Sequence, residues 1–474
     1  MRAKQRVEIK KFNNLNINSN EVLSEAFYNY KVGKALTNSS GVKVASFPIN
    51  STSSEQYQLK IAEAGIEKVD GIAYFKQYFP ENGKTTHRLL VYGSDQKVYI
   101  NQMLDDIPDL YWLYNLTFSS APITLAYKKD DNDAIILASK NEMKIWKTGY
   151  SPYTIEDVPI ITSMCMNDGV LFCTIKEPAF KIWYATDLDA EKVGLSNTGS
   201  GYVSLEDDLG YARKIITYNE EVYVFRDYGI SKVNYIKGEV SFNQIYVSGT
   251  KIYTDTVALC GNEILFLTKN GVYSFNGVKV TKTEIELPNL NFENVNATAT
   301  SLADRYYLAL RLDFGDERKI LCENENYINN ALLIFDTINK SYEIIRGVDI
   351  KTLLPIKTEE FEKMLVTFNT MYTNLVGEIS SSSTCMQQSL PKLWRSGDLV
   401  NNVQTKLFTK LSVVADEGVK VKLIYDNKSL SFTTYQNGVN QFMFKIHCKQ
   451  IKLEISSEND SGNVDKVVLD YYEY

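Results

Sequence analysis

Glu220-Glu221-Val222-Tyr223-Val224-Phe225-Arg226-Asp227-Tyr228-Gly229-Ile230-Ser231-Lys232-Val233-Asn234-Tyr235 is the stretch that decides the fold class. It reads as an apolar run, a turn with a glycine, and a second run in which apolar and polar residues alternate. The pattern returns at 262–275, at an offset of about 42 residues, which lies in the range of β-propeller blades. Within the second copy, the dipeptide Asn270-Gly271 predicts a type I′ hairpin turn, which needs positive φ at both central residues.

Similar hairpins follow one another along most of the chain, spaced roughly 35 to 60 residues apart. No amphipathic helix of three turns separates them, so the crossovers of a parallel α/β fold are missing. The sequence therefore predicts an all-β fold with a β-propeller of six or seven blades over residues 61–380. The runs that mark the units are 71–75 with 88–92, 134–138 with 143–146, 169–173 with 181–184, the two copies above, 305–310 with 331–335, and 364–368 with 375–379.

The two ends of the chain have different patterns. Residues 1–60 are predicted to be an N-terminal extended segment, with a short helix over 21–27 that Ser19 or Asn20 would cap. The serine-rich stretch 380–384 is typical of a linker, with a loop inside a single domain as the alternative. Residues 390–474 contain runs of strict apolar and polar alternation, which predict a C-terminal antiparallel β-sandwich-like domain.

The composition is that of a globular protein and disfavours a nucleic-acid clamp. The 474 residues are 44% hydrophobic and carry a net charge of -7, whereas a protein that grips DNA over its whole surface is normally basic. No signal-peptide pattern opens the chain, and no apolar run approaches the roughly 20 residues of a membrane span. The six cysteines are scattered, so we expect single buried thiols and a reducing compartment, with Cys165 and Cys173 as the two that could meet.

Acidic clusters provide the residue types of a metal site, but each has a structural interpretation that we favour. Asp130-Asp131-Asn132-Asp133 offers oxygen ligands for Ca²⁺, yet it falls at an expected hairpin turn. It also lacks the glycine and the distal glutamate of an EF-hand loop. Thr186-Asp187-Leu188-Asp189 and Glu206-Asp207-Asp208 are similar, so we predict no metal site.

Catalytic signatures are missing from the sequence. His87 and His447, the two histidines, fall in different predicted domains, which argues against a histidine triad or a two-histidine metal site. Nothing marks two carboxylates as the pair that a glycosidase needs, and no nucleophile elbow, Walker loop or dinucleotide fingerprint occurs. We therefore predict no catalytic residue, no cofactor-binding residue, no cofactor and no enzymatic activity.

Two further sets of residues have both a binding and a structural interpretation. Trp146, Trp183 and Trp394 lie at strand starts or edges, where they would either stack on a carbohydrate or, more commonly, pack in the core. Lysines that alternate with apolar residues near the C-terminus are typical of the solvent face of a sheet, with a face for nucleic acid or a partner as the alternative. These lysines are Lys406, Lys410, Lys420, Lys422, Lys445, Lys449 and Lys452.

Short motifs along the whole chain resemble the tail nozzle and head-closure (stabilisation) proteins of short-tailed bacteriophages. The opening resembles theirs at 12–16, 23–30, 32–37 and 41–44, although Asn14 stands where the family usually has glycine. The run 215–225 followed by Gly229-Ile230 is similar to lines in their propeller units. The C-terminal region is similar at Trp394-Arg395-Ser396 and at Asp470-Tyr471-Tyr472-Glu473-Tyr474.

This resemblance implies a structural virion protein assembled in the host cytoplasm. It implies a homo-oligomeric ring at the head–tail connector, with a hexamer favoured, that contacts the portal, an adaptor or other tail proteins. DNA would pass through the lumen without specific binding and would be retained there until ejection. The alternatives are a propeller that binds glycans or hydrolyses glycosides at a tail tip, and a cytosolic interaction scaffold.

Overall fold

Strands dominate the chain, as the alternating sequence pattern predicts, and α1 (Ser51–Glu63) is the only helix in the part that the structure describes. In this computed structural model the described residues are 4–9, 12–13, 22–28, 30–33, 43–44, 51–101, 111–129, 132–155, 157–186, 188, 199–236, 239–285, 287, 290, 293–314, 327–347, 349–369, 374–379, 384–385, 388–399, 404–458 and 462–473.

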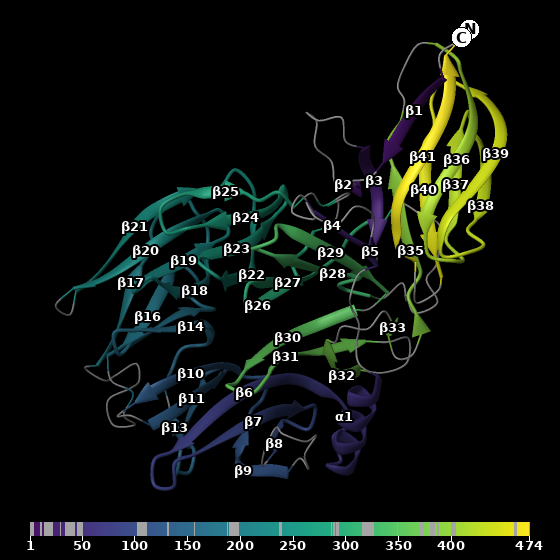
Figure 1. The fold of residues 1–474 in the computed structure, drawn as a ribbon. Coiled ribbons are helices and arrows are strands. Elements are labelled where there is room, and N and C mark those ends of the chain that lie inside the picture. The colour runs from purple at the N-terminus through teal and green to yellow at the C-terminus, as the bar shows by residue number, and fades with distance from the viewer. Residues whose placement is uncertain are drawn as a thin grey trace.

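Seven successive antiparallel sheets form the blades of a β-propeller in the described part of the chain (Figure 1). Blades 1 and 2 contain β6 (Val69–Phe79), β7 (Lys84–Gly93), β8 (Lys97–Ile100) and β9 (Tyr111–Thr117), then β10 (Ile123–Lys129), β11 (Asn132–Ser139), β12 (Glu142–Lys147) and β13 (Tyr153–Ile155). Blades 3 and 4 contain β14 (Ile161–Asn167), β15 (Val170–Ile175), β16 (Lys181–Ala185) and β17 (Ser200–Ser204), then β18 (Ala212–Tyr218), β19 (Glu221–Arg226), β20 (Gly229–Ile236) and β21 (Glu239–Val247).

The remaining three blades complete the circle. Blade 5 contains β22 (Ile252–Cys260), β23 (Glu263–Thr268), β24 (Gly271–Phe275) and β25 (Val280–Lys282). Blade 6 begins with β26 (Thr298–Leu302), β27 (Arg305–Leu310), β28 (Ala331–Asp336) and β29 (Ser341–Arg346), and blade 7 contains β30 (Asp349–Lys357), β31 (Glu362–Asn369) and β32 (Asn374–Ile379). The first strands of successive blades contact one another in order, and β30 contacts β6, so the ring of sheets is closed.

The predicted all-β propeller is confirmed, with seven blades in the described residues. Val222 on β19 and Ile264 on β23 occupy the second strands of blades 4 and 5, so the repeat that suggested the fold is a repeat of consecutive blades. Both side chains are buried, since each second strand has a neighbouring strand on both sides and a neighbouring blade on each face. The element that repeats in the sequence is therefore the buried second strand of each blade.

The predicted turn type at Asn270-Gly271 is wrong. Thr268 pairs directly with Gly271, so Lys269 and Asn270 are the two loop residues. Gly271 has a φ of 119°, whereas Asn270 has no positive φ, so the loop lacks the two positive φ values that a type I′ turn needs. The two positive φ values of a type I′ turn occur instead at Asn219 and Glu220, between β18 and β19.

Helix α1 takes the place of a fourth strand beside blade 7. It contacts β32, the last strand of that blade, and buries Tyr57 and Ile61 in one core with Leu365 and Val376. The sequence pattern does not predict this helix, because only a narrow stripe of it is apolar. The spacing of Thr52 and Glu55, which is that of a capping box, was the signal that could have located it.

Two further sheets form a β-sandwich that includes strands from both ends of the chain (Figure 1). One sheet has the order β1 (Lys4–Ile9), β41 (Val464–Glu473), β36 (Lys406–Ala415), β39 (Gly438–Cys448). The other has the order β2 (Phe12–Asn13), β3 (Val22–Tyr28), β35 (Lys392–Ser396), β40 (Lys452–Ser457), β37 (Lys420–Tyr425), β38 (Lys428–Thr433). The short pair β33 (Thr384–Cys385) and β34 (Gln388–Ser389) precedes it.

The helix predicted over 21–27 is wrong, because this stretch is strand β3, which pairs antiparallel with β35 of the sandwich. The stretch is rich in apolar and aromatic residues that suit a sheet, and pairing with a distant strand overrides a local capping signal. Farther along, β4 (Tyr30–Gly33) pairs with β29 of blade 6 and with β5 (Lys43–Val44). The N-terminal segment therefore adds edge strands to the sandwich and to the propeller.

One buried tyrosine lies at the junction of the two units. Tyr30 is fully buried, and its hydroxyl donates a hydrogen bond to the Gly462 carbonyl oxygen at 3.0 Å. The same hydrophobic cluster contains Leu308 from blade 6 and Trp394 and Leu411 from the sandwich. A continuous core therefore joins the propeller to the sandwich.

Lys406 departs from the predicted pattern of solvent-facing lysines. Its side chain is fully buried, its ammonium group lies 4.0 Å from the Glu473 carboxylate, and the Tyr471 ring is 6.0 Å away. Among the described residues it has no hydrogen-bond partner. The other predicted lysines are exposed or half-buried, so the alternation is right for them and wrong for the first residue of β36.

Buried tyrosines predict that the fold loses stability in alkali. Burial raises the pKa of Tyr30, Tyr57 and Tyr306 well above the ordinary value of 10.0, and it raises the pKa of Tyr74 and Tyr99 to about 12. The folded state therefore holds these protons where the unfolded state releases them, so the tyrosines lower the free energy of unfolding only above about pH 10. Burial also raises the pKa of Cys165 and Cys260 from 9.0, which adds a loss that begins above about pH 9. Urea midpoints followed between about pH 7 and pH 11.5 should therefore begin to decrease above about pH 9 and fall more steeply above about pH 10. An unchanged midpoint at the highest pH would contradict this expectation.

Candidate functional site

The acidic clusters singled out in the sequence do not assemble into a metal site in the described residues. Asp133 accepts a hydrogen bond from the Tyr78 amide at 2.8 Å, at a β10–β11 hairpin whose Asp130 and Asp131 lie outside the described residues. Thr186 donates to the Gly199 carbonyl oxygen, while Asp187 and Asp189 also lie outside the described residues. Asp207 pairs with Arg226. The described acids are thus used in turns and loops.

Three tryptophans lie in the core, and the two histidines lie in separate units of the molecule. Trp183 and Trp394 are fully buried and Trp146 is 6% exposed, which confirms the core interpretation and leaves no carbohydrate platform on these three rings. His87 lies on β7 in blade 1, with its Nδ1 2.6 Å from the Tyr74 hydroxyl, whereas His447 lies on β39 of the sandwich. The structure does not bring the two histidines together.

Four described cysteines, Cys165, Cys173, Cys260 and Cys448, are buried free thiols, as expected from their spacing. Cys165 and Cys173 lie on the neighbouring strands β14 and β15 but are not bonded to each other. Burial raises the pKa of Cys165 to about 12 and that of Cys260 to about 11, so these thiols hold their protons at neutral pH. They are therefore poor nucleophiles.

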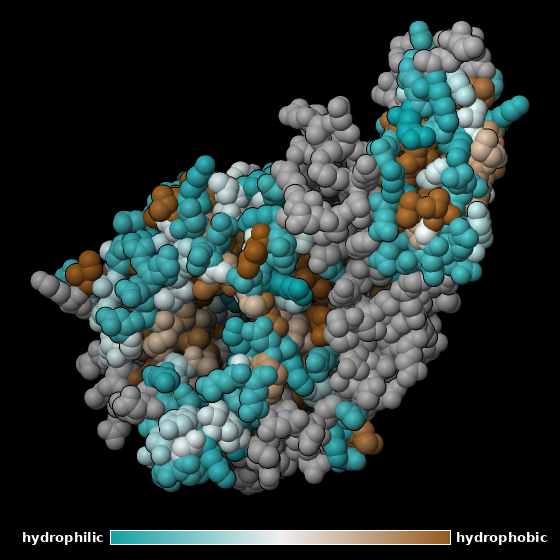
Figure 2. All heavy atoms as spheres, viewed as in Figure 1, coloured by the Kyte–Doolittle hydropathy of each residue, from teal (hydrophilic) through white to brown (hydrophobic). Residues whose placement is uncertain are grey.

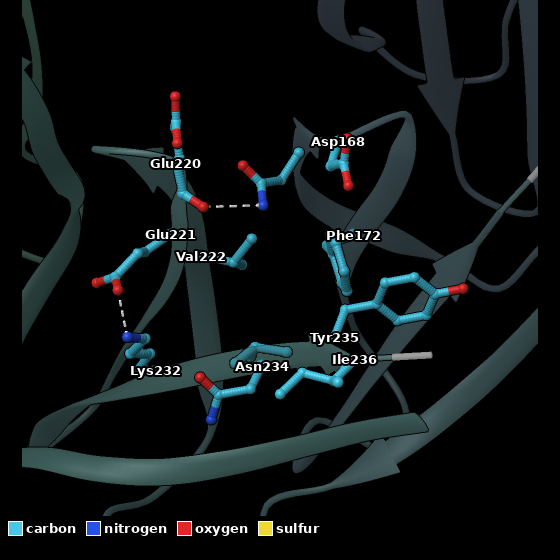
Figure 3. A pocket seen from close by; sticks show the side chains of 11 residues that line it. Asp168, Phe172, Glu220, Glu221, Val222, Lys232, Asn234, Tyr235 and Ile236 are labelled. Atoms are coloured by element: carbon cyan, nitrogen blue, oxygen red, sulfur yellow. Dashed lines mark hydrogen bonds and ion pairs between the residues drawn. The ribbon is translucent and has the colours of Figure 1, made fainter. Parts of the chain in front are cut away.

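A groove of about 640 Å³ lies between blades 3 and 4 (Figure 3). Phe172 of β15 and Tyr235 of β20 form an apolar wall, with ring centroids 6.3 Å apart. Glu221 and Lys232 form an ion pair on the opposite side. Asp168, at the β14–β15 turn, and Glu220, at the β18–β19 turn, are exposed at the rim. We call this cavity the interblade groove.

Local geometry fixes both sides of the interblade groove. The Asn167 side-chain amide donates to the Glu220 carbonyl oxygen at 3.2 Å and so links the two turns. The hydrogen bond from Lys232, followed by that from the Tyr223 hydroxyl, lowers the pKa of Glu221 and keeps it ionised. The groove thus presents an aromatic face and carboxylates, which are groups that can contact a polar ligand or a partner loop.

A second cavity of about 400 Å³ lies at the mouth of the propeller axis, where the first strands of blades 3 to 5 begin. The Arg213 guanidinium lies over the Tyr211 ring at 4.9 Å and pairs with Asp227 at 3.3 Å. Asp227 also accepts a hydrogen bond from the Tyr211 amide at 3.0 Å. Asp255 also lines this cavity. The Asp227 carboxylate is already bonded to the Arg213 side chain and the Tyr211 amide, so it holds these two residues in place.

The loop beside this axial mouth is held by Arg226, a fully buried guanidinium. Its Nε donates to the Gly210 carbonyl oxygen at 3.1 Å, one terminal nitrogen donates to the Gly210 and Leu205 carbonyl oxygens at 2.6 and 3.3 Å, and the other pairs with Asp207. Burial lowers the pKa of Arg226, while Asp207 opposes this effect. The five donors of a guanidinium suit such multiple bonding.

The sequence does not predict the interblade groove or the bonds that the buried Arg226 guanidinium makes. Phe172 and Tyr235 are about one blade apart in the chain, and they meet only because consecutive blades pack side by side. No local signal marks either residue, since an apolar residue in a strand normally reads as core. Arg226 reads in the sequence as an ordinary turn-flanking residue.

Comparisons with known proteins find distant structural similarities and assign no function. No family model and no curated protein match the chain. Among solved structures it is similar to BBS1N, solved in complex with ARL6DN, at 12% identity over 68% of this chain and 96% of that chain, with a TM-score of 0.42. It is also similar to an ancestral GH74 enzyme, at 9% identity over 66% of this chain and 48% of that chain, with a TM-score of 0.44. A third similar structure is the N-terminal domain of Nup159, at 8% identity over 78% of this chain and 99% of that chain, with a TM-score of 0.38.

Proposed function

We propose that this protein is a structural, non-enzymatic component of a phage neck or short tail, either a tail nozzle or a head-closure protein. Copies of the chain form a ring around the DNA channel and retain the packaged genome. Loops of the propeller contact the portal, an adaptor or other tail proteins. The family resemblance of the sequence motifs is the starting point of this proposal.

The observation that carries the proposal is the way the N-terminal segment ties the molecule together. β1 pairs with β41, β3 with β35, and β4 with β29, so one segment borders both sheets of the sandwich and one blade. At β41 the tie is ionic, since the buried Asp470 carboxylate binds Lys4 at 2.8 Å and Arg6 at 2.9 Å. Such a body transmits load without hinging, which suits a wall under the pressure of packaged DNA.

The net charge of the chain and the hydropathy of its surface agree with this role. The net charge of -7 repels DNA in transit rather than holding it. Figure 2 shows a mostly polar face interrupted by small apolar patches, which suits contacts with neighbouring subunits more than one extended ligand site. In the described residues no helix is long and apolar enough to cross a membrane.

Disrupting the gene that encodes this chain tests the proposal. Particles assembled without the protein are expected to package DNA and then lose it, because no ring closes the channel. DNase sensitivity of the purified particles measures this loss, and supplying the intact gene in trans should restore protection. Particles that keep their DNA and infect normally without the protein would overturn the proposal.

A glycan-binding role at a tail tip is the second candidate, and the interblade groove is the observation that favours it. The Tyr235 ring and the oxygens of Asn234, Asp168 and Glu220 are the kinds of group that stack on and hydrogen-bond to sugars. Under this alternative, wild-type protein binds host cell-wall oligosaccharides in calorimetry and Tyr235→Ala does not. Normal DNA retention together with such binding would favour the second candidate.

A further inference from the structure

The two longest outer-edge strands of the molecule have no strand beyond them in the described residues. β21 is the outer strand of blade 4 and spans Glu239–Val247, and β39 is the outer strand of one sandwich sheet and spans Gly438–Cys448. An unpaired edge presents a row of free backbone donors and acceptors, and proteins normally keep such edges short or charged. Long open edges therefore need a reason.

The two edges lie at opposite ends of the molecule (Figure 1). A contact between β21 of one copy and β39 of the next is heterologous, so it repeats from copy to copy and closes a ring or extends a filament. A contact of either strand with itself would instead make a twofold dimer. The placement of the edges thus matches the kind of interface that a ring of identical copies requires.

The side chains of the two strands are complementary. In β21 the one charged residue is Glu239, which is exposed, whereas β39 has exposed Lys445 and His447 and no acid. Both edges also carry exposed apolar side chains, Val247 at 60% on β21 and Met443 at 74% on β39. Figure 2 shows an apolar patch at the outer end of the β20–β21 hairpin, where Ile236 is 65% exposed.

Strand regularity sets the stretches that can pair. β21 keeps an unbroken register with β20 over 239–244, and β39 keeps one with β36 over 438–443; each register then shifts. If these equal stretches align antiparallel, Glu239 lies opposite Met443 of the next copy, and Lys445 follows two residues later, just beyond the register shift. Lys445 is the lysine nearest to Glu239 in this alignment, and long side chains reach neighbouring positions across a strand pair.

We propose that β21 of one copy pairs with β39 of a second copy, and that this β-augmentation is the lateral contact of the ring. The contact joins blade 4 of each propeller to the sandwich of its neighbour as a continuous sheet. The proposed β21–β39 contact rests on the proposed ring and specifies which strands form the interface of that ring. The occupant of each edge is the other edge of an identical chain.

Charge reversal and its rescue test this pairing. Wild-type protein is expected to run as a ring in native mass spectrometry and in sedimentation. Glu239→Lys or Lys445→Glu alone should raise the concentration at which half of the ring dissociates by about tenfold or more, because like charges then meet. The double variant E239K/K445E should recover the wild-type value. Val278→Lys, at an 85% exposed position in the β24–β25 turn, is the matched control and should leave the ring intact.

Each outcome separates this inference from the function on which it rests. Rings that withstand both single reversals would overturn the β21–β39 pairing and leave the ring standing. Single variants that dissociate without rescue in the double variant would also overturn the pairing of these two residues. A wild-type chain that stays monomeric at every concentration would overturn the ring and the pairing together. Circular dichroism of each variant shows whether the fold is kept.

Discussion

Arg226→Met is expected to lower the free energy of unfolding by about 3–5 kcal/mol. The substitution keeps most of the side-chain volume but removes every donor that the buried guanidinium provides. The Gly210 carbonyl oxygen then loses its partner, the Leu205 carbonyl oxygen keeps only its bond from the Asp207 amide, and the Asp207 carboxylate, whose side chain is 23% exposed, loses its counter-charge. A buried acceptor without a donor costs about 1–3 kcal/mol, and the unpaired Asp207 carboxylate adds to this cost, which is why the expected loss is large. Urea unfolding followed by tryptophan fluorescence measures it.

Arg213→Met is the matched control for this prediction. Arg213 lies close to the same loop and also pairs with an aspartate, but its side chain is 45% exposed. An exposed ion pair contributes about 0–1 kcal/mol, so this variant should unfold close to the wild-type urea concentration. Equal losses in the two variants would show that burial of the guanidinium is not what stabilises the loop.

Tyr30→Ala is expected to destabilise the protein by about 3–5 kcal/mol, the usual cost of truncating a large buried aromatic side chain. The side chain is fully buried in the core that joins blade 6 to the sandwich, and its hydroxyl bonds to Gly462. Because both units lose contacts, hydrogen exchange should accelerate in β29 and in β41 alike. Tyr30→Phe removes only the hydrogen bond and should cost about 0.5–1.5 kcal/mol.

The control for Tyr30 is Tyr150→Ala, since Tyr150 is 64% exposed. Its truncation should change the unfolding free energy by less than about 0.5 kcal/mol, as is usual for surface positions. Faster exchange confined to β4 in Tyr30→Ala, with β29 and β41 unchanged, would contradict a shared core. In that case the N-terminal segment would be an appendage and not a tie.

The architecture could be predicted from the sequence because it depends on local pattern. Hairpins with buried central strands repeat in the chain, and the copies at Val222 and Ile264 mark equivalent strands of consecutive blades. The alternating runs after residue 390 likewise identify a half-buried sheet. Each of these signals lies within a few residues of the chain, where strand periodicity acts.

Features that depend on distant parts of the chain could not be predicted in this way. The stretch 22–28 has a capping residue before it and looks helical locally, but β35 is available as a partner and makes it a strand. Lys406 fits the alternation of its strand, yet it lies under the Tyr471 ring with Glu473 nearby. The interblade groove exists only because two blades are neighbours, so its residues carry no mark in sequence.

The mass of the purified wild-type chain in native mass spectrometry tests the central claim most directly. A closed ring of about six to twelve copies is the result that the proposed neck or tail protein predicts, because heterologous contacts between identical subunits close on themselves. A single 54.0 kDa species that persists at high protein concentration would contradict it.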